Sequence, residues 1–96
     1  MAKGYWVATY RSVSDPEALA RYGGPAAEII KAHGGRILAR GIPVRVYEAT
    51  GPQRCVVVEF DTVAAAIAAY ESDAYTQVRQ ILKGAVERDI QILEGV

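Results

Sequence analysis

Residues 54–60 read Arg-Cys-Val-Val-Val-Glu-Phe, and this stretch decides the fold. β-Branched and aromatic side chains dominate it, so it predicts a strand. Successive side chains of a strand point to opposite faces of the sheet. Cys55 and Val57 therefore share one face, whereas Val58 and Phe60 share the other. Both faces of the strand are apolar, and the sheet that contains it needs cover on both sides.

The two ends of the chain are also predicted strands. Residues 4–11, Gly-Tyr-Trp-Val-Ala-Thr-Tyr-Arg, are aromatic and β-branched, and again both faces are apolar. Residues 86–94 follow a different pattern, in which apolar and polar residues alternate as in a half-buried strand. In this last segment Val86, Ile90 and Ile92 alternate with Glu87, Asp89 and Gln91.

A less regular strand is predicted over residues 36–40 and 44–50, interrupted by Gly41-Ile42-Pro43. Proline cannot donate a hydrogen bond to a neighbouring strand, so the interruption predicts a bulge or a sheet edge. Gly51-Pro52 then predicts a turn into the strand at 54–60.

A first helix begins at Ser14-Asp15-Pro16-Glu17, where either of the first two residues caps it and proline fits the first turn. Gly34-Gly35 ends it, because glycine tolerates the left-handed conformation of a C-terminal cap. Gly23-Gly24-Pro25 predicts a break or kink, since each glycine costs ~1 kcal/mol relative to alanine in a helix. The apolar stripe of this helix is Leu19, Tyr22, Ala26, Ile29, Ile30 and His33.

Asp61 or Thr62 caps a second, alanine-rich helix that runs through Tyr70. Ser72-Asp73 is a fresh cap for a further helical stretch that reaches Leu82. The order of elements is β-α-β-β-α-β, the ferredoxin-like arrangement, with the helices on one face of a four-stranded antiparallel sheet. We therefore predict a single α+β domain over residues 1–96.

Helices in this arrangement cover one face of the sheet, yet the other face is apolar too. An exposed apolar face of that size exceeds what a soluble monomer usually tolerates. A second copy packed face to face about a two-fold axis would cover it, which predicts a homodimer. The alternative is that aromatic residues such as Tyr5 and Tyr10 are ordinary half-exposed strand residues.

Composition excludes several classes of protein. Eleven basic residues balance eleven acidic ones without a basic face, so we expect neither a nucleic-acid nor a membrane partner. The longest apolar stretch, residues 63–70, is too short to span a bilayer, and residues 1–4 run into a strand without a signal peptide. The single cysteine, Cys55, allows no intramolecular disulfide, which fits a cytoplasmic location. One histidine and one cysteine predict no metal site and no cofactor.

His33 is the only histidine and lies at the end of the first helix, where the helix dipole favours its protonated form. It is a candidate general acid or base, or a haem ligand. The alternative is a capping histidine that bonds to a helix carbonyl.

Glu59 faces the same side as two apolar residues of its strand, so it either pairs with a cation or has a raised pKa. Arg36, Arg40 and Arg11 on neighbouring strands are the candidate partners. A salt bridge that ties the sheet together is the alternative to a catalytic role.

Tyr70, Ser72 and Tyr75 gather where the second helix breaks. Their hydroxyls could hydrogen-bond a ligand carbonyl or carboxylate. Alternatively the tyrosines are packing residues and Ser72 is only the cap.

Four motifs closely resemble a small bacterial family, domain of unknown function 1330, over nearly the whole chain. They are His33-Gly-Gly-Arg-Ile-Leu-Ala-Arg-Gly41, Val56-Val-Val-Glu-Phe60, Tyr70-Glu-Ser-Asp-Ala-Tyr75 and Leu93-Glu-Gly95. The resemblance implies the dimeric α/β-barrel superfamily, in which two ferredoxin-like subunits face their sheets together. Relatives there include cofactor-free monooxygenases, muconolactone isomerases, haem-degrading enzymes and chlorite dismutases, which bind small organic molecules or haem between sheet and helices. The family itself has no assigned activity.

Three functions remain open at this point. The first is a cofactor-free enzyme of the monooxygenase or isomerase type that acts on a small organic molecule. The second is a dimer that binds or senses such a molecule without turnover, and the third handles haem through His33. For the enzyme, the candidate catalytic residues are His33, Glu59 and Tyr70, and the candidate ligand-binding residues are Arg36, Arg40, Ser72 and Tyr75.

Overall fold

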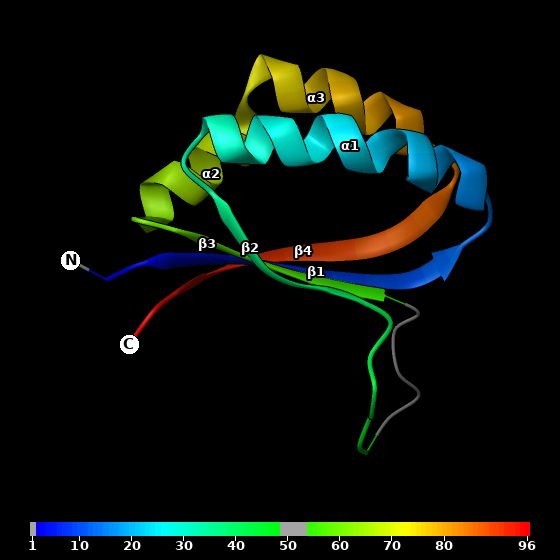
Figure 1. The fold of residues 1–96 in the computed structure, drawn as a ribbon, viewed down its shortest axis with the longest axis horizontal. Coiled ribbons are helices and arrows are strands. Elements are labelled where there is room, and N and C mark those ends of the chain that lie inside the picture. The colour runs from blue at the N-terminus through cyan, green and yellow to red at the C-terminus, as the bar shows by residue number, and fades with distance from the viewer. Residues whose placement is uncertain (1, 49–53) are drawn as a thin grey trace.

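Four strands form one antiparallel sheet in the order β2-β3-β1-β4, with the helices on one face (Figure 1). The computed structural model describes residues 2–48 and 54–96. None of the helices in these residues is long and apolar enough to cross a membrane. The strands are β1 (Gly4–Val13), β2 (Arg36–Gly41), β3 (Arg54–Phe60) and β4 (Val86–Glu94), and the helices are α1 (Pro16–Ala32), α2 (Val63–Glu71), α3 (Asp73–Arg79) and a 3₁₀ turn (Gln80–Leu82).

The strand alternation expected from the sequence is confirmed. On the face toward the helices, which we call the inner face, Trp6 of β1 lies between Val58 of β3 and Ile92 of β4. Trp6, Ala8 and Tyr10 are buried, whereas the residues between them are half-buried on the outer face. The α+β, ferredoxin-like fold is therefore as predicted, with the last strand at residues 86–94.

Aromatic packing around Trp6, which is 2% exposed, forms the centre of the core. Its ring stacks on Phe60 with centroids 6.1 Å apart. Tyr75 and Tyr70 meet it edge-on, at 5.0 and 5.6 Å. Because these two tyrosines belong to α3 and α2, the contacts hold both helices against the sheet.

Each helix begins at a polar side chain that accepts a backbone N–H hydrogen bond. Asp15 accepts from Ala18 at 3.1 Å and thereby caps α1. Thr62 caps α2 through the N–H of Ala65 at 3.0 Å. Ser72 caps α3 in the same way. Of the alternatives that the sequence left open, Asp15 and Thr62 are the caps.

A break or kink was predicted at Gly23-Gly24-Pro25, and the break was wrong, because α1 runs as one helix through these residues. Proline disfavours helical geometry in the residue before it mainly through a clash with that residue's Cβ. Gly24 has no Cβ, so this part of the clash is absent and the helix continues into Pro25. Pro25 still removes one intrahelical hydrogen bond, and its ring crowds the carbonyl four residues before it.

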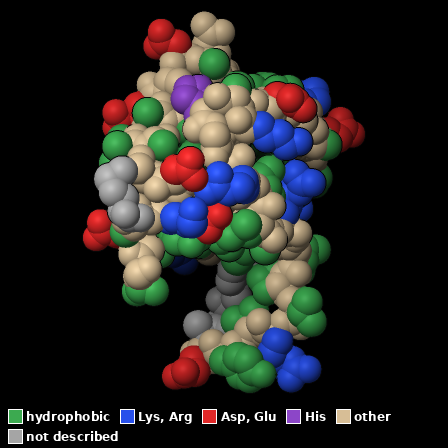
Figure 2. All heavy atoms as spheres, turned by 60° about the vertical axis from the view of Figure 1, so that its left-hand side comes forward, with side chains coloured by type: hydrophobic (Ala, Val, Ile, Leu, Met, Phe, Trp, Pro, Cys, Tyr) green, Lys and Arg blue, Asp and Glu red, His purple; other side chains and the backbone are tan. Residues whose placement is uncertain are grey.

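The predicted strand at residues 44–50 was also wrong for residues 44–48, which are irregular, while residues 49–50 and the turn at 51–52 lie outside the described residues. β2 ends at Gly41, whose φ of 146° only glycine adopts readily. There the chain leaves the sheet and projects away from the helices (Figure 1). We call residues 42–48 the arm. Its apolar side chains are exposed (Figure 2), namely Ile42, Val44, Val46 and Tyr47.

The bulge expected near this interruption lies earlier, inside the edge strand β2. The pairing with β3 shifts between Ile37 and Ala39. Ile37 pairs with Val58 and Arg40 pairs with Val56, so both face the helices although they are three residues apart. The bulge therefore places Arg40 on the inner face.

Replacing Gly23 by alanine should stabilise the fold. Nothing lies within 4 Å of a Cβ built at Gly23, and alanine is favoured over glycine in a helix interior by ~0.5–1 kcal/mol. Gly24→Ala is the matched control, because its Cβ would meet the ring of Pro25. We expect urea unfolding to show a gain for Gly23→Ala and a smaller gain or a loss for Gly24→Ala. Equal gains at both positions would contradict this account of the unbroken helix.

Candidate functional site

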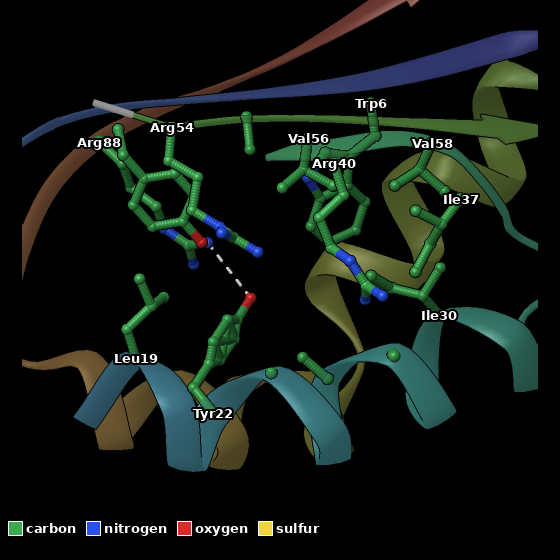
Figure 3. A pocket seen from close by; sticks show the side chains of 15 residues that line it. Trp6, Leu19, Tyr22, Ile30, Ile37, Arg40, Arg54, Val56, Val58 and Arg88 are labelled. Atoms are coloured by element: carbon green, nitrogen blue, oxygen red, sulfur yellow. Dashed lines mark hydrogen bonds between the residues drawn. The ribbon is translucent and has the colours of Figure 1, made fainter. Parts of the chain in front are cut away.

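A pocket of about 80 Å³ lies between α1 and the inner face of the sheet (Figure 3). That space is several times the ~10–15 Å³ that one ordered water needs. It exists because α1 presents small residues, Gly23, Ala26 and Ala27, where a larger side chain would fill the gap. Its walls are mostly apolar and aromatic: Trp6, Ala8, Tyr10, Leu19, Tyr22, Ala26, Ala27, Ile30, Ile37, Val56 and Val58.

Three arginines complete the lining, one from each of three strands. Arg40 comes from β2, Arg54 from β3 and Arg88 from β4, and all three extend from the sheet toward α1 (Figure 3). Arg40 and Arg54 also border an open hollow along α1, so they lie at the mouth of the pocket. The described lining residues include neither a carboxylate nor a histidine.

The guanidinium of Arg88 is held by three phenols. Its Nη1 donates to the hydroxyl oxygens of Tyr10 at 3.0 Å and Tyr22 at 3.2 Å, and its Nη2 donates to Tyr75 at 3.2 Å. The hydroxyls of Tyr22 and Tyr75 also share a short hydrogen bond. The guanidinium carbon lies 5.2 Å from the ring centre of Tyr22 and 5.5 Å from that of Tyr10. We call these four side chains the Arg88 cluster.

Burial raises the pKa of the Tyr10, Tyr22 and Tyr75 phenols above the ordinary value of 10.0, although Arg88 acts to lower each of them. All three hydroxyls are therefore neutral at physiological pH. A guanidinium stays protonated in proteins. The Arg88 cluster consequently carries one positive charge that no partner within it neutralises.

Of the residues proposed from the sequence, Arg40 lines this pocket, and Tyr75 contacts it through Arg88. Tyr70 packs on Trp6 and borders a different hollow, beside β4. Ser72 caps α3 and also donates its hydroxyl to the carbonyl of Ala69 at 2.8 Å.

The remaining three proposed residues lie outside the pocket. Nδ1 of His33 is 2.9 Å from the carbonyl of Ile29, the contact of a capping histidine. Glu59 faces the outer side of the sheet, where it accepts from Tyr5 at 2.8 Å and from Arg36 at 3.0 Å. Arg36 also donates to Asp61 at 3.0 Å. The sequence predicted that Glu59 either pairs with a cation or has a raised pKa. The structure shows the pairing, with Arg36.

The hydrogen bond from Tyr5 and the one from Arg36 hold the pKa of the Glu59 carboxyl below its ordinary value of 4.5. The hydrogen bond between Tyr5 and Glu59 raises the pKa of the Tyr5 phenol. Of the other cations considered as partners, Arg40 faces inward, and Arg11 pairs with Asp89.

Sequence reasoning missed Arg88, Arg54, Tyr10 and Tyr22 as site residues. A signal for Arg88 was present, because position 88 shares the parity of Val86, Ile90 and Ile92 and so falls on the buried side of β4. A charged residue at a buried position without an obvious partner is itself a pointer to a site.

Within residues 2–48 and 54–96, no group of three or more His, Cys, Asp or Glu side chains could hold a metal ion. Cys55 is a free, half-buried thiol. Among the described lining residues, the charged groups are arginines and the hydroxyl groups are phenols.

The sheet and the helices on its inner face define a small α+β protein of the ferredoxin-like class. Residues 3–96 match the model of the family described as "Domain of unknown function (DUF1330)". The chain belongs to this family. No curated protein sequence matches the chain.

Solved structures share the fold at low sequence identity. A protein of unknown function from Rhodopseudomonas palustris is 16% identical with a TM-score of 0.78, covering 99% of this chain and 83% of that one. A dimeric ferredoxin-like protein of unknown function from Thermobifida fusca is 13% identical with a TM-score of 0.69, covering 97% and 91%. SnoaB, a cofactor-independent oxygenase from Streptomyces nogalater, is 9% identical with a TM-score of 0.71, covering 97% and 92%.

Replacing Glu59 by glutamine should lower stability in a pH-dependent way. The pKa of this carboxyl is lower in the folded protein than its ordinary value of 4.5. Its ionised form therefore stabilises the fold above that value, and the contribution is lost as the pH falls through the lowered pKa. In urea unfolding, the wild-type advantage over Glu59→Gln should be complete at neutral pH and vanish in acid. Glu28→Gln, on the exposed side of α1, is the control, and a wild-type advantage over Glu59→Gln that stays constant with pH would contradict the ionised pairing.

Proposed function

We propose that this protein is a homodimer that binds a small, flat organic molecule in the pocket between α1 and the sheet, in the cytoplasm. One observation carries the proposal: an apolar and aromatic cavity into which a few polar groups converge. Ligand sites of soluble proteins typically have this composition, because apolar walls supply affinity and a few polar groups fix orientation.

Binding without turnover agrees best with the lining residues. General acid–base catalysis needs a group whose pKa lies near the operating pH. The described lining residues offer arginines and phenols of raised pKa, whereas His33 and Glu59 lie outside the pocket. A proton acceptor would have to come from the substrate itself or from the partner subunit.

A cofactor-free enzyme of the monooxygenase or isomerase type is the second candidate. The Arg88 cluster gathers hydrogen-bond donors around a fixed cation, an arrangement that stabilises negative charge as it develops on an oxygen. The likeness of the fold to SnoaB agrees with this candidate. For an enzyme of this kind we assign the catalytic role to Arg88 and Tyr22. The roles predicted for His33, Glu59 and Tyr70 remain predictions.

The homodimer is supported by the apolar groups that one subunit leaves in water. Leu93 on the outer face of β4 is 53% exposed, and Val44 on the arm is 98% exposed. The arm projects on the side of the sheet that no helix covers (Figure 1). A second copy packed on the outer face would bury that face and give the arm a surface to rest on.

A charge at the centre of the outer face should break the dimer. Val57 pairs with Val7 on one side and Ala39 on the other, so Val57→Lys puts an ammonium group in the middle of the proposed interface. Sedimentation at micromolar concentration should give dimers for the wild type and monomers for this variant. Ile67→Lys is the control, because Ile67 is 40% exposed but lies on α2, on the helix side of the sheet. A monomeric wild type would refute the homodimer.

Filling the mouth of the pocket should abolish ligand binding. Gly23 lines the pocket and a Cβ there meets nothing within 4 Å, so Gly23→Trp places an indole at the entrance. Ala20→Trp is the matched control, because Ala20 is exposed on α1 and borders the open hollow outside the pocket. In a thermal-shift screen of planar metabolites, with haem and flavin included, a ligand at about 100 times its Kd stabilises the protein by ~2.7 kcal/mol.

We expect hits to stabilise the wild type and Ala20→Trp but not Gly23→Trp. Hits that stabilise all three proteins equally would refute the pocket as the binding site.

A further inference from the structure

We propose that the ligand of this pocket is a carboxylate carried on a flat, apolar body, and that Arg88 is the residue that binds the carboxylate. The inference rests on the proposed function, because it assigns a chemical class to the molecule in the same pocket. Four features of the described residues support it: unbalanced charge, surplus donors, the shape of the guanidinium and the character of the walls.

The charged side chains that line the pocket are all positive. Arg40, Arg54 and Arg88 line it, and the lining within the described residues contains no acid. Arg88 also borders two further hollows. The other charged residues of the one beside α3 are Arg79 and Lys83, and that of the one beside β4 is Glu71, which forms no ion pair with Arg88 among the described residues. Cations gathered in a partly dry cavity are unfavourable unless an anion joins them.

The acids nearest to Arg88 in the sequence do not supply that anion. Glu87 and Asp89 flank it on β4, but strand alternation directs them to the outer face. Asp89 is already bound there by Arg11, whose Nε lies 2.9 Å from its carboxylate. Among the described residues, Arg88 therefore has phenol oxygens but no carboxylate as partners.

The Arg88 cluster also has more hydrogen-bond donors than acceptors. A guanidinium has five N–H groups and each phenol has one O–H group. Three contacts from Arg88 end on the phenol oxygens, and one phenol proton joins Tyr22 to Tyr75. The hydroxyl proton of Tyr10 has no acceptor among the described residues. A carboxylate, which only accepts, is the complement of such a cluster.

The shapes agree as well. A planar guanidinium forms paired, parallel hydrogen bonds with a carboxylate, and such charged bonds are about twice as strong as neutral ones. Leu19, Ala26 and Ile37 enclose the adjoining space with apolar surface that suits a ring or a short hydrocarbon body. Arg40 and Arg54 at the mouth would attract an acid from solution before it reaches Arg88.

The test compares benzoate with benzamide, which has nearly the same shape but no charge. Binding is measured in every protein by isothermal titration calorimetry. Trp6 is the only tryptophan of the wild type and lines the pocket, so its fluorescence also reports binding there in the proteins without an added tryptophan. The proteins are the wild type, Arg88→Gln, Arg88→Lys and the pocket-filling Gly23→Trp. Arg21→Gln is the matched control, because it removes the same charge from the exposed side of α1.

We expect the wild type and Arg21→Gln to bind benzoate at least ~10-fold more tightly than benzamide. Arg88→Gln should weaken benzoate binding about 10- to 100-fold and erase the preference. Arg88→Lys should keep the preference at lower affinity, because it keeps the charge but not the planar fork. Gly23→Trp should bind neither compound.

Three results would overturn the inference. If benzamide binds the wild type as well as benzoate does, and Gly23→Trp blocks both, the proposed binding function stands and the carboxylate assignment fails. If benzoate binds Arg88→Gln and Gly23→Trp unchanged, its site lies elsewhere. If neither compound binds the wild type at millimolar concentration, the carboxylate assignment fails and the screen of planar metabolites decides the binding function separately.

Discussion

The packing of Trp6 against Phe60, Tyr70 and Tyr75 ties the sheet to α2 and α3. These large rings cover one part of the inner face. The neighbouring helix, α1, covers the remaining part of that face. α1 does so with small residues, Gly23, Ala26 and Ala27, and the difference in size leaves the pocket open. The cavity therefore follows from how the inner face is divided between α1 and the pair of helices α2 and α3. It is not a surface feature added to a complete core.

Arg88 shows how an ionised group can lie in such a core. Three phenols satisfy much of its hydrogen bonding, and burial keeps those phenols neutral by raising their pKa values. Hydrogen bonds to neutral oxygens reduce the cost of removing a cation from water but do not cancel its charge. The arrangement is stable enough to fold and remains electrostatically incomplete, as expected for a site that receives its last component from solution.

Much of the fold could be predicted from the sequence because local rules and the global fold agree there. β4 alternates cleanly, and Asp15, Thr62 and Ser72 cap their helices as side chains of their type do. The errors came from the local conformation of two glycines. Gly24 let the helix continue into a proline, and Gly41 directed the chain out of the sheet.

The site was predicted less well, because pocket residues come from five separate elements. Arg40 faces inward only because a bulge in β2 shifts its register, which composition does not reveal. His33 drew interest as the only histidine, yet its ring bonds to a backbone carbonyl of its own helix. Arg88 was detectable from strand parity, but only when a charged residue on a buried face is taken as a signal.

The early end of β2 also affects how the protein avoids aggregation through the edge of its sheet. An open sheet border can template the addition of foreign strands, and short, charged borders resist this. β2 has only six residues, includes Arg36 and Arg40, contains a bulge and stops where Gly41 turns the chain aside. This side of the sheet is consequently a poor seed for amyloid-like growth, even though the strands behind it are among the most apolar of the chain.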